Sequence, residues 1–325
     1  MSKSPWLLPQ GVTEILPDAA AKLEKLRRQV LDDLQQSGFQ LVFPPMMEFI
    51  DSLIQGAGVD LTTQTFKVPD QDSLKTLGIR ADMTPQIAQI DGHRLQGNAI
   101  NRLCYIGTVL HTKPNTLGGS RELLQFGAEV FGDDSLKADQ AIVDAMVSSL
   151  KVGGIDSMIV SLSHVGIFTD LVKQLKITDV LRAKLFDAMQ RKSTPDIAEL
   201  NVNSDSDLSI FQELLSSRGE QSVIQTFSNT LKNAGLLSER IITALNDIDN
   251  LAKHLNKESA VDVHIDLVEL HGYRYHTGLT FQAFIANEGK AIAKGGRYAG
   301  ISCDDNTRPA TGFSADLKVL ANVST

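Results

Sequence analysis

Hydrophobic residues recur along the chain with two periods, one typical of helices and one typical of strands. Between residues 18 and 37, leucine and valine return at every third or fourth position, which predicts an amphipathic helix. The apolar run from Phe39 to Phe43 follows it and predicts a short strand. A second helix is predicted over Leu136 to Leu150, and a further strand over Ser157 to Ser163. The first half of the chain therefore mixes both kinds of element.

The stretch from Cys104 to Gly132 predicts a strand, a long polar loop and a second strand. Tyr105 to Leu110 and Phe126 to Phe131 are apolar, and loop-forming proline, asparagine and glycine lie between them. Glu129 interrupts the second strand, and a buried carboxylate costs several kcal/mol unless it has a partner. Gln125 lies on the same strand face, so the pair predicts a polar floor beneath a pocket. The alternative is that Glu129 lies at a sheet edge and meets water.

The second half of the chain changes in character. From about residue 166 to residue 256, apolar residues recur at helical spacing in several successive segments. No group of residues typical of a catalytic site occurs among them. We interpret this segment as an all-helical insertion that packs against the core or faces a partner. Residues 261 to 270 alternate as in a half-buried strand. The predicted domains are a first core segment (1–165), the helical insertion (166–256) and a second core segment (257–325).

The composition is that of an ordinary globular protein and disfavours several classes. The chain has 325 residues, of which 42% are hydrophobic and 22% charged, and no apolar run approaches the ~20 residues of a membrane span. No signal peptide is predicted at its start. The net charge is −8, and no dense lysine and arginine cluster predicts a nucleic-acid surface. Cys104 and Cys303 are expected to be reduced thiols, which favours the cytoplasm. Neither a metal site nor a cofactor is expected.

Several segments resemble the class II histidyl-tRNA synthetases in their order and spacing. GIRADMT (78–84) precedes the strand–loop–strand stretch, which resembles motif 2. HGYRYHTGLTFQAFIA (271–286) and KGGRYAG (294–300) resemble the histidine-specific signature, and RPATGFSADLKVL (308–320) resembles motif 3. The resemblance implies an α+β fold, in which an antiparallel sheet is flanked by helices and carries a helical insertion. It also implies that the anticodon-binding domain of a synthetase is missing.

The resemblance implies that the amino-acid pocket is retained. Asp82, Thr84 and Gln125 would receive the α-ammonium group of a histidine ligand. Glu129 would accept one imidazole N–H, and Tyr275 would bond the other ring nitrogen. A pocket that bonds both nitrogens strongly rejects analogues that lack them. Considered without the family resemblance, the same local sequence predicts a helix that starts with Thr84 as its N-cap. Helix capping and ligand binding by Thr84 are compatible interpretations.

The same resemblance implies that the ATP site is lost. The arginine positions of motif 2, the signature and motif 3 hold His111, His271 and Val319. Neutral histidine and valine cannot replace the fixed, charged fork of arginine. Losing one such group typically lowers a rate by ~10²–10³, so adenylation should be abolished. Arg121 could replace one of the lost arginines if the loop register shifts.

Other positions of the ATP site have changed as well. Lys113, Lys318 and Asp316 stand where the synthetases carry two acids and a glycine. His111 and His271 are assigned to the histidine-binding residues instead, because they could help to hold the ligand carboxylate.

A histidine pocket without an ATP site fits the regulatory subunits of ATP phosphoribosyltransferase, which are related to histidyl-tRNA synthetases. The resemblance implies a non-catalytic chain that activates a short-form catalytic subunit in the first step of histidine biosynthesis. It also implies feedback inhibition by L-histidine, a dimer within a hetero-octamer, and no nucleic-acid or membrane partner. The alternatives are an enzyme that still adenylates histidine and a synthetase-derived nucleic-acid-binding module, which the acidic charge disfavours.

Overall fold

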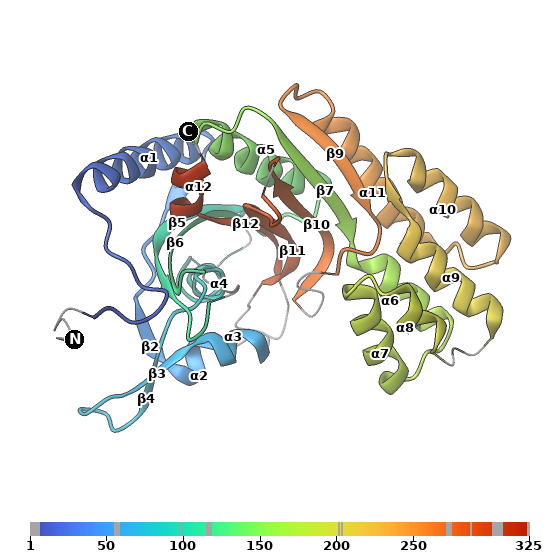
Figure 1. Cartoon of the computed structure of the whole chain (residues 1–325), viewed down its shortest axis with the longest axis horizontal. Helices are drawn as coiled ribbons and strands as arrows, with labels where there is room; N and C mark the ends of the chain where they lie inside the picture. Colours follow the sequence, from blue (N-terminus) through green and yellow to red (C-terminus); the bar gives the residue numbers. More distant parts are fainter. Residues whose placement is uncertain are drawn as a thin grey trace, which may run out of the picture. The chain divides into compact units, whose positions relative to one another are not determined.

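The computed structural model describes most of the chain, and its internal contacts divide the chain into two compact units. The described residues are 7–54, 59–95, 97, 99–114, 119–200, 202, 204–270, 275–286, 288–300 and 308–323. The first unit comprises Met1–Asp133, Asp144–Ile155 and Gly300–Thr325, and the second comprises Asp134–Val143 and Asp156–Ala299. Figure 1 shows the elements of both units in their order along the chain.

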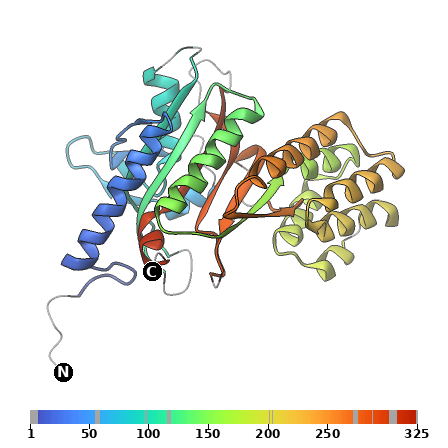
Figure 2. The same ribbon diagram turned by 90° about the horizontal axis from the view of Figure 1, so that it is seen from above.

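The first unit is built on four strands in the order β1-β5-β6-β12. They are β1 (Gln40–Leu41), β5 (Asn101–Leu110), β6 (Glu122–Phe131) and β12 (Arg308–Asp316). Strand β1 is parallel to β5, whereas β6 is antiparallel to both of its neighbours, β5 and β12. Helices α1 (Pro17–Gln36) and α12 (Leu317–Val323) contact each other and the sheet, as Figure 2 shows.

A small second sheet lies in the same unit, with the order β2-β4-β3. Its strands are β2 (Met47–Phe49), β3 (Phe66–Pro69) and β4 (Thr76–Ile79). Helices α2 (Ile50–Leu53) and α3 (Val59–Gln64) lie between β2 and β3 in the chain. After β4 come helix α4 (Thr84–Gln89) and a turn of π-helix, η1 (Ile90–Leu95).

An ion pair ties η1 to the start of β12. Arg308 Nε lies 2.9 Å from Asp91 Oδ2, and the side chain of Asp91 is 1% exposed. Asn101 at the start of β5 donates a hydrogen bond of 2.6 Å to Asp91 Oδ1. The guanidinium of Arg308 also donates to the backbone carbonyls of Gly97 and Ala99. We call Asp91, Asn101 and Arg308 the terminal clamp, because it joins the ends of three elements.

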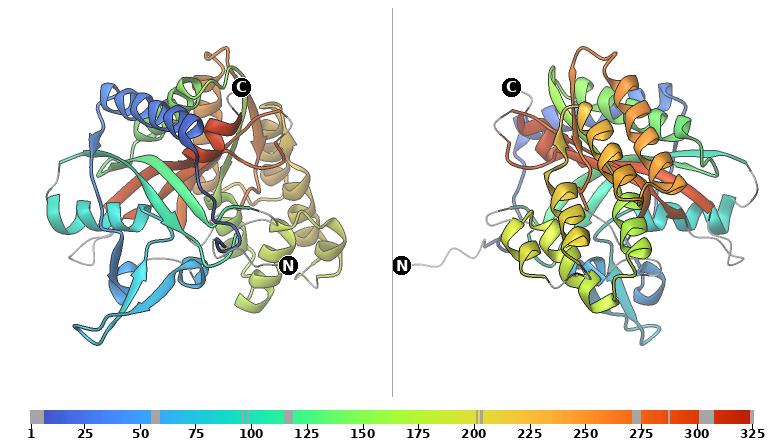
Figure 3. Two further views of the ribbon diagram at one scale, coloured as in Figure 1. Left: turned by 60° about the vertical axis from the view of Figure 1, so that its left-hand side comes forward. Right: turned by 90° about the vertical axis from the view of Figure 1, so that its right-hand side faces the viewer.

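The second unit has its own strands and most of the helices. Its strands are β7 (Met158–His164), β8 (Arg218–Gly219), β9 (Val261–Asp266), β10 (His276–Phe284) and β11 (Ala293–Gly300), in the order β11-β10-β7-β9-β8. Its helices are α6 (Val165–Gln174), α7 (Asp179–Gln190), α8 (Thr194–Ala198), α9 (Asp205–Ser216), α10 (Ser222–Asn233) and α11 (Glu239–Leu255). Figure 3 shows these six helices gathered together, coloured from yellow-green to orange. Helix α5 (Leu136–Val152) begins in the second unit and ends in the first.

The elements predicted from hydrophobic spacing are largely present. Both predicted helices occur, as α1 and α5, and the strands predicted in the 104–132 stretch are β5 and β6. The predicted insertion is not entirely helical, because it contains the two residues of β8, which pair with β9 beyond its end. Helices α6 and α11 also pack directly on β7 and β10 of the same unit. The division at residues 166 and 256 stays a prediction.

None of the helices in the described ranges is long and apolar enough to cross a membrane.

His164 links the end of β7 to the start of α6. Its Nδ1 accepts a hydrogen bond of 3.0 Å from the backbone N–H of Gly166, so it serves as the N-cap of the helix. A side chain at position 166 would meet the imidazole ring, since an added Cβ would lie 2.7 Å from its Cε1. Burial and the nearby charge of Arg297 lower the pKa of His164 from 6.5 to about 4. The imidazole is therefore neutral at physiological pH.

We expect His164 to make the chain less stable as the pH falls from 6.5 to 4. In that window the unfolded chain binds a proton that the folded chain does not, so acidification favours unfolding by at most about 3 kcal/mol. His164→Asn should keep a capping acceptor and flatten this pH dependence in urea unfolding. The matched control is His93→Asn, because His93 is exposed. Equal pH dependence in the wild type and His164→Asn would contradict this account.

Candidate functional site

Strand β6 separates an apolar face from a polar face. Phe126 and Val130 are buried on one side, where the ring of Phe126 meets that of Phe313 edge-on, 6.0 Å between centroids. Gln125 and Glu129 point to the other side, as strand alternation requires. Gln125 and Glu129 therefore share one buried face, as predicted, and the pocket above them stays a prediction. Because β6 lies between β5 and β12 and Glu129 is 1% exposed, the alternative of a sheet-edge position is wrong.

Glycines on this face make room for the functional side chains. Gly312 of β12 is paired with Glu129, and a Cβ at position 312 would lie 1.6 Å from Glu129 Oε2. Gly127 is paired with Tyr105 of β5, and its Cβ would lie 2.6 Å from the Tyr105 hydroxyl. Each glycine thus leaves the space above its own strand to a larger polar side chain on the neighbouring strand.

Tyr105 connects two of the predicted site residues. Its hydroxyl donates a hydrogen bond of 3.2 Å to Glu129 Oε1 and shares another of 3.1 Å with Thr84 Oγ1. Burial, followed by the negative charges of Glu129 and Asp82, raises the pKa of Tyr105 well above 10. The hydroxyl therefore stays protonated and remains a donor to the buried carboxylate.

Asp82 and Gln125 are held together at the other end of this face. Gln125 Nε2 donates 2.7 Å to Asp82 Oδ1, which also accepts the backbone N–H of Thr84 at 3.0 Å. Gln125 Oε1 accepts the backbone N–H of Met83 at 2.9 Å. The second carboxylate oxygen of Asp82 makes no hydrogen bond within the described residues and can accept a cationic group.

Arg80 fixes the loop that carries Asp82. It donates 2.8 Å to the backbone carbonyls of Thr108 and Pro44, and burial lowers its pKa. A Cβ at Gly107 would lie 2.5 Å from its Nη2, so this glycine is needed for the close approach. The Arg80 guanidinium thus bonds to main-chain carbonyls, and these contacts position the loop.

The predicted N-cap role of Thr84 is wrong. Helix α4 begins at Thr84 with Met83 as its N-cap residue, and no side chain caps the helix. The hydroxyl of Thr84 bonds to Tyr105 instead. Pro85 lies in the first turn of the helix, as predicted.

The positions where synthetases clamp ATP carry side chains with other partners. His111 is 6% exposed, and its Nε2 lies 2.9 Å from the carbonyl oxygen of Ala81. Lys318 Nζ donates 2.9 Å to the backbone carbonyl of Glu122. Val319 is 39% exposed and offers no polar group.

Arg121 and Asp316 lie close to these substituted positions. Arg121 Nε donates 3.1 Å to the carbonyl of His111, and its guanidinium lies 5.1 Å from the centre of the Phe66 ring. Asp316 Oδ1 accepts the N–H groups of Leu124 and Lys318, while burial raises the pKa of the Asp316 carboxyl. Arg121 is thus already engaged by a carbonyl and a ring.

Four predicted residues, namely Asp82, Thr84, Gln125 and Glu129, are brought together within the first unit. Tyr275 belongs to the second unit, where its ring stacks on that of Tyr298 with 4.7 Å between centroids. His271 lies outside the described residues. The roles predicted for Tyr275, His271 and His111 in binding histidine stay predictions.

Sequence reasoning missed Tyr105 as a member of the site. The signal for it was Gly127, an isolated glycine in a buried strand, which often marks a close approach by a neighbour. Only the pairing of β5 with β6 identifies Tyr105 as that neighbour.

Comparisons with known proteins relate this chain to two groups of proteins. A sequence model of the histidyl-tRNA synthetase family matches residues 11–320. The ATP phosphoribosyltransferase regulatory subunit of Thioalkalivibrio sulfidiphilus (strain HL-EbGR7) is 41% identical, over 98% of this chain and 81% of its own length. The protein of the same name from Methylococcus capsulatus is 43% identical, over 98% of this chain and 79% of its own length.

A solved structure shares the fold over the whole chain. It is an ATP phosphoribosyltransferase regulatory subunit/histidyl-tRNA synthetase from Bacillus halodurans, with a TM-score of 0.86 and 25% identity. The match covers 100% of this chain and 84% of that one. The fold is therefore that of a class II, histidyl-tRNA synthetase-like protein. Within that class, the chain belongs to the family of ATP phosphoribosyltransferase regulatory subunits.

We expect Gly312→Ala to destabilise the chain by about 1–3 kcal/mol, because the new Cβ would overlap the buried carboxylate of Glu129. Urea unfolding measures the change. In the double variant Glu129→Ala/Gly312→Ala, the two losses should be clearly less than additive. Gly289→Ala is the control, because a Cβ there meets nothing within 4 Å. Additive losses would show that Gly312 does not act through Glu129.

Proposed function

We propose that the chain is a histidine-sensing, non-catalytic regulatory subunit that acts on a separate, short-form catalytic subunit of ATP phosphoribosyltransferase. The observation that carries the proposal is the buried Glu129 carboxylate, which is joined through Tyr105 to Thr84 beside the Asp82–Gln125 pair. The names of relatives at 41% and 43% identity support the choice of catalytic partner.

The chemistry of this group suits histidine. A neutral imidazole presents one N–H donor, and a buried carboxylate accepts such a donor more strongly than a neutral oxygen does. The hydrogen bond from Tyr105 to Oε1 of Glu129 holds this carboxylate in position. Asp82 keeps an oxygen for the α-ammonium group at the other end of the floor. Gln125, which holds Asp82, lies four residues before Glu129 on β6, so strand spacing separates the two ends of the floor.

The proposed lack of catalysis follows from the former ATP-clamping positions. His111 donates its Nε2–H to a backbone carbonyl, so in the neutral ring Nδ1 carries a lone pair and repels a phosphate. For the same reason His111 can hold a ligand carboxylate only as an imidazolium. Lys318 is directed to the carbonyl of Glu122. Val319, at the arginine position of motif 3, has no charge to contribute, and the third arginine position, His271, lies outside the described residues.

Regulation requires that histidine binds the active and the inactive assembly with different affinity. A coupling of about 1–3 kcal/mol changes the affinity 5- to 150-fold, and the partner must then affect histidine binding by the same factor. By family resemblance we place the chain as a dimer within a hetero-octamer, with the helical segment as a candidate contact surface. We also propose a cytoplasmic location, which the buried free thiol of Cys104 favours.

We expect Glu129→Gln to weaken L-histidine binding at least tenfold in isothermal titration, because the amide accepts the imidazole N–H without charge assistance. Glu48→Gln is the matched control, since Glu48 lies on β2 and bonds to Gln86 outside this group. Histidine-dependent exchange of pyrophosphate into ATP should be undetectable in both proteins. Detectable exchange would support the alternative of residual adenylation.

The regulatory role predicts a separate result in the reconstituted complex with a short-form catalytic subunit. The wild-type chain should raise the rate of ATP and phosphoribosyl pyrophosphate condensation, and histidine should reduce it. Glu129→Gln should still activate but should need at least tenfold more histidine for inhibition. If inhibition is unchanged, the sensor lies elsewhere, and if no activation occurs, the partner assignment is wrong.

A further inference from the structure

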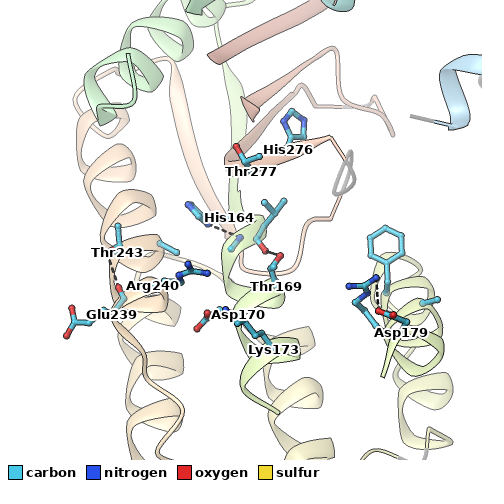
Figure 4. Close-up of a pocket in the computed structure, with 16 residues that line it drawn as sticks. His164, Thr169, Asp170, Lys173, Asp179, Glu239, Arg240, Thr243, His276 and Thr277 are labelled. Atoms are coloured by element: carbon cyan, nitrogen blue, oxygen red, sulfur yellow. Dashed lines mark hydrogen bonds and ion pairs between the residues drawn. The ribbon is translucent and has the colours of Figure 1, made fainter. Parts of the chain in front are cut away.

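The second unit contains a cavity that none of the predicted site residues lines. Its volume is about 970 Å³, which is in the range of pockets that hold small organic ligands. Helices α6, α7 and α11 and the start of β10 form its wall (Figure 4). The four residues Asp82, Thr84, Gln125 and Glu129, which we call the histidine floor, belong to the first unit. The cavity therefore needs its own explanation.

Three basic side chains line the cavity, one from each helix. They are Lys173 of α6, Arg182 of α7 and Arg240 of α11. The charged groups of Lys173 and Arg240 make no hydrogen bond or ion pair with any residue in the described part of the chain. Figure 4 shows Arg240 extending from α11 toward α6. Two cations without a hydrogen-bond or ion-pair partner on facing helices favour an anionic occupant.

The acidic residues of the lining are less available to contact a ligand than the basic residues are. Asp179 forms an ion pair of 3.1 Å with Arg182. Asp170 is buried, and its Oδ2 accepts hydrogen bonds from Ser238 at 2.5 Å and Gln174 at 2.9 Å. Figure 4 shows the carboxylate of Glu239 on the side of α11 that faces away from α6. The groups left to meet a ligand are therefore mainly cationic.

The helices present their positive ends to the same space. Residues of the first turn of α6, α7 and α11 all line the cavity, and each of these helices has ten or more residues. Their N-caps, His164, Thr178 and Ser238, satisfy one backbone N–H each but leave the helix dipoles in place. The dipoles add to the attraction that the basic side chains exert on an anion.

His164 adds a neutral donor at the end of the cavity near β10. Its Nδ1 accepts the N–H of Gly166, which places the proton of the neutral ring on Nε2. Nε2 has no hydrogen-bond partner among the residues that the structure describes, and the side chain lines the cavity. An acceptor atom of a ligand would satisfy it.

The rest of the wall is apolar and includes one aromatic ring. Val165, Ala183, Phe186 and Ala244 contribute it. An inorganic ion would leave most of such a cavity unfilled, whereas a planar ring could pack against Phe186.

We propose that this cavity binds a phosphorylated small molecule that carries a planar ring, of the size and chemistry of a nucleoside monophosphate. Lys173 and Arg240 hold the phosphate, Phe186 contacts the ring, and His164 Nε2–H donates to an acceptor on the ligand. The site is independent of histidine sensing and does not require ATP to bind in the first unit.

Isothermal titration with adenosine monophosphate, uridine monophosphate, ribose 5-phosphate and inorganic phosphate tests the proposal on the full chain. We expect both nucleotides to bind more tightly than ribose 5-phosphate, and inorganic phosphate to bind most weakly. Lys173→Gln and Arg240→Gln should each weaken nucleotide binding at least tenfold, and added salt should weaken it in the wild type. Phe186→Leu should weaken nucleotide binding but leave inorganic phosphate binding unchanged.

Lys232→Gln is the matched control, because Lys232 is an exposed lysine of α10 outside the cavity, and it should bind nucleotides like the wild type. The Glu129→Gln variant should also bind nucleotides like the wild type, and this result would distinguish the cavity from the histidine floor. The proposal is overturned if none of the four probes binds. It is equally overturned if Lys173→Gln and Arg240→Gln bind nucleotides as tightly as the wild type.

Discussion

The site depends on a close approach between large polar side chains and neighbouring backbone. A carboxylate and a phenol can share one face of a packed sheet only where the paired residues have no side chains, and Gly312 and Gly127 meet that condition. The hydrogen bond from Tyr105 then offsets part of the desolvation of Glu129. The buried charge, the raised pKa of Tyr105 and the position of Thr84 all follow from this arrangement.

The contacts in the first unit separate the proposed histidine-binding residues from the positions where synthetases clamp ATP. Residues of the histidine floor are held by one another, through side chains that bond across β5, β6 and the loop before α4. The former ATP positions instead bond to backbone carbonyls nearby, as His111 does to Ala81 and Lys318 to Glu122. Changes at the ATP positions therefore need not disturb the histidine floor.

Much of the fold and part of the site could be predicted, because both follow from local periodicity. Gln125 and Glu129 share a face since strands alternate, and the long helices follow from leucine spacing. Tyr105 could not be predicted, because its partner depends on the register between two strands. The cavity of the second unit could not be predicted either, because its basic residues come from three helices that are separate in sequence. Thr84 was misjudged as an N-cap because a tertiary hydrogen bond competes with the local one.

The terminal clamp has a mechanical consequence. Helix α4 starts at Thr84 and continues through η1 to Asp91, while β12 runs from Arg308 to the glycine that faces Glu129. The ion pair between Asp91 and Arg308 thus closes a ring of elements whose opposite side is the histidine floor. A displacement of Thr84 along the axis of α4 would therefore have to move Asp91 with it or break the ion pair between Asp91 and Arg308.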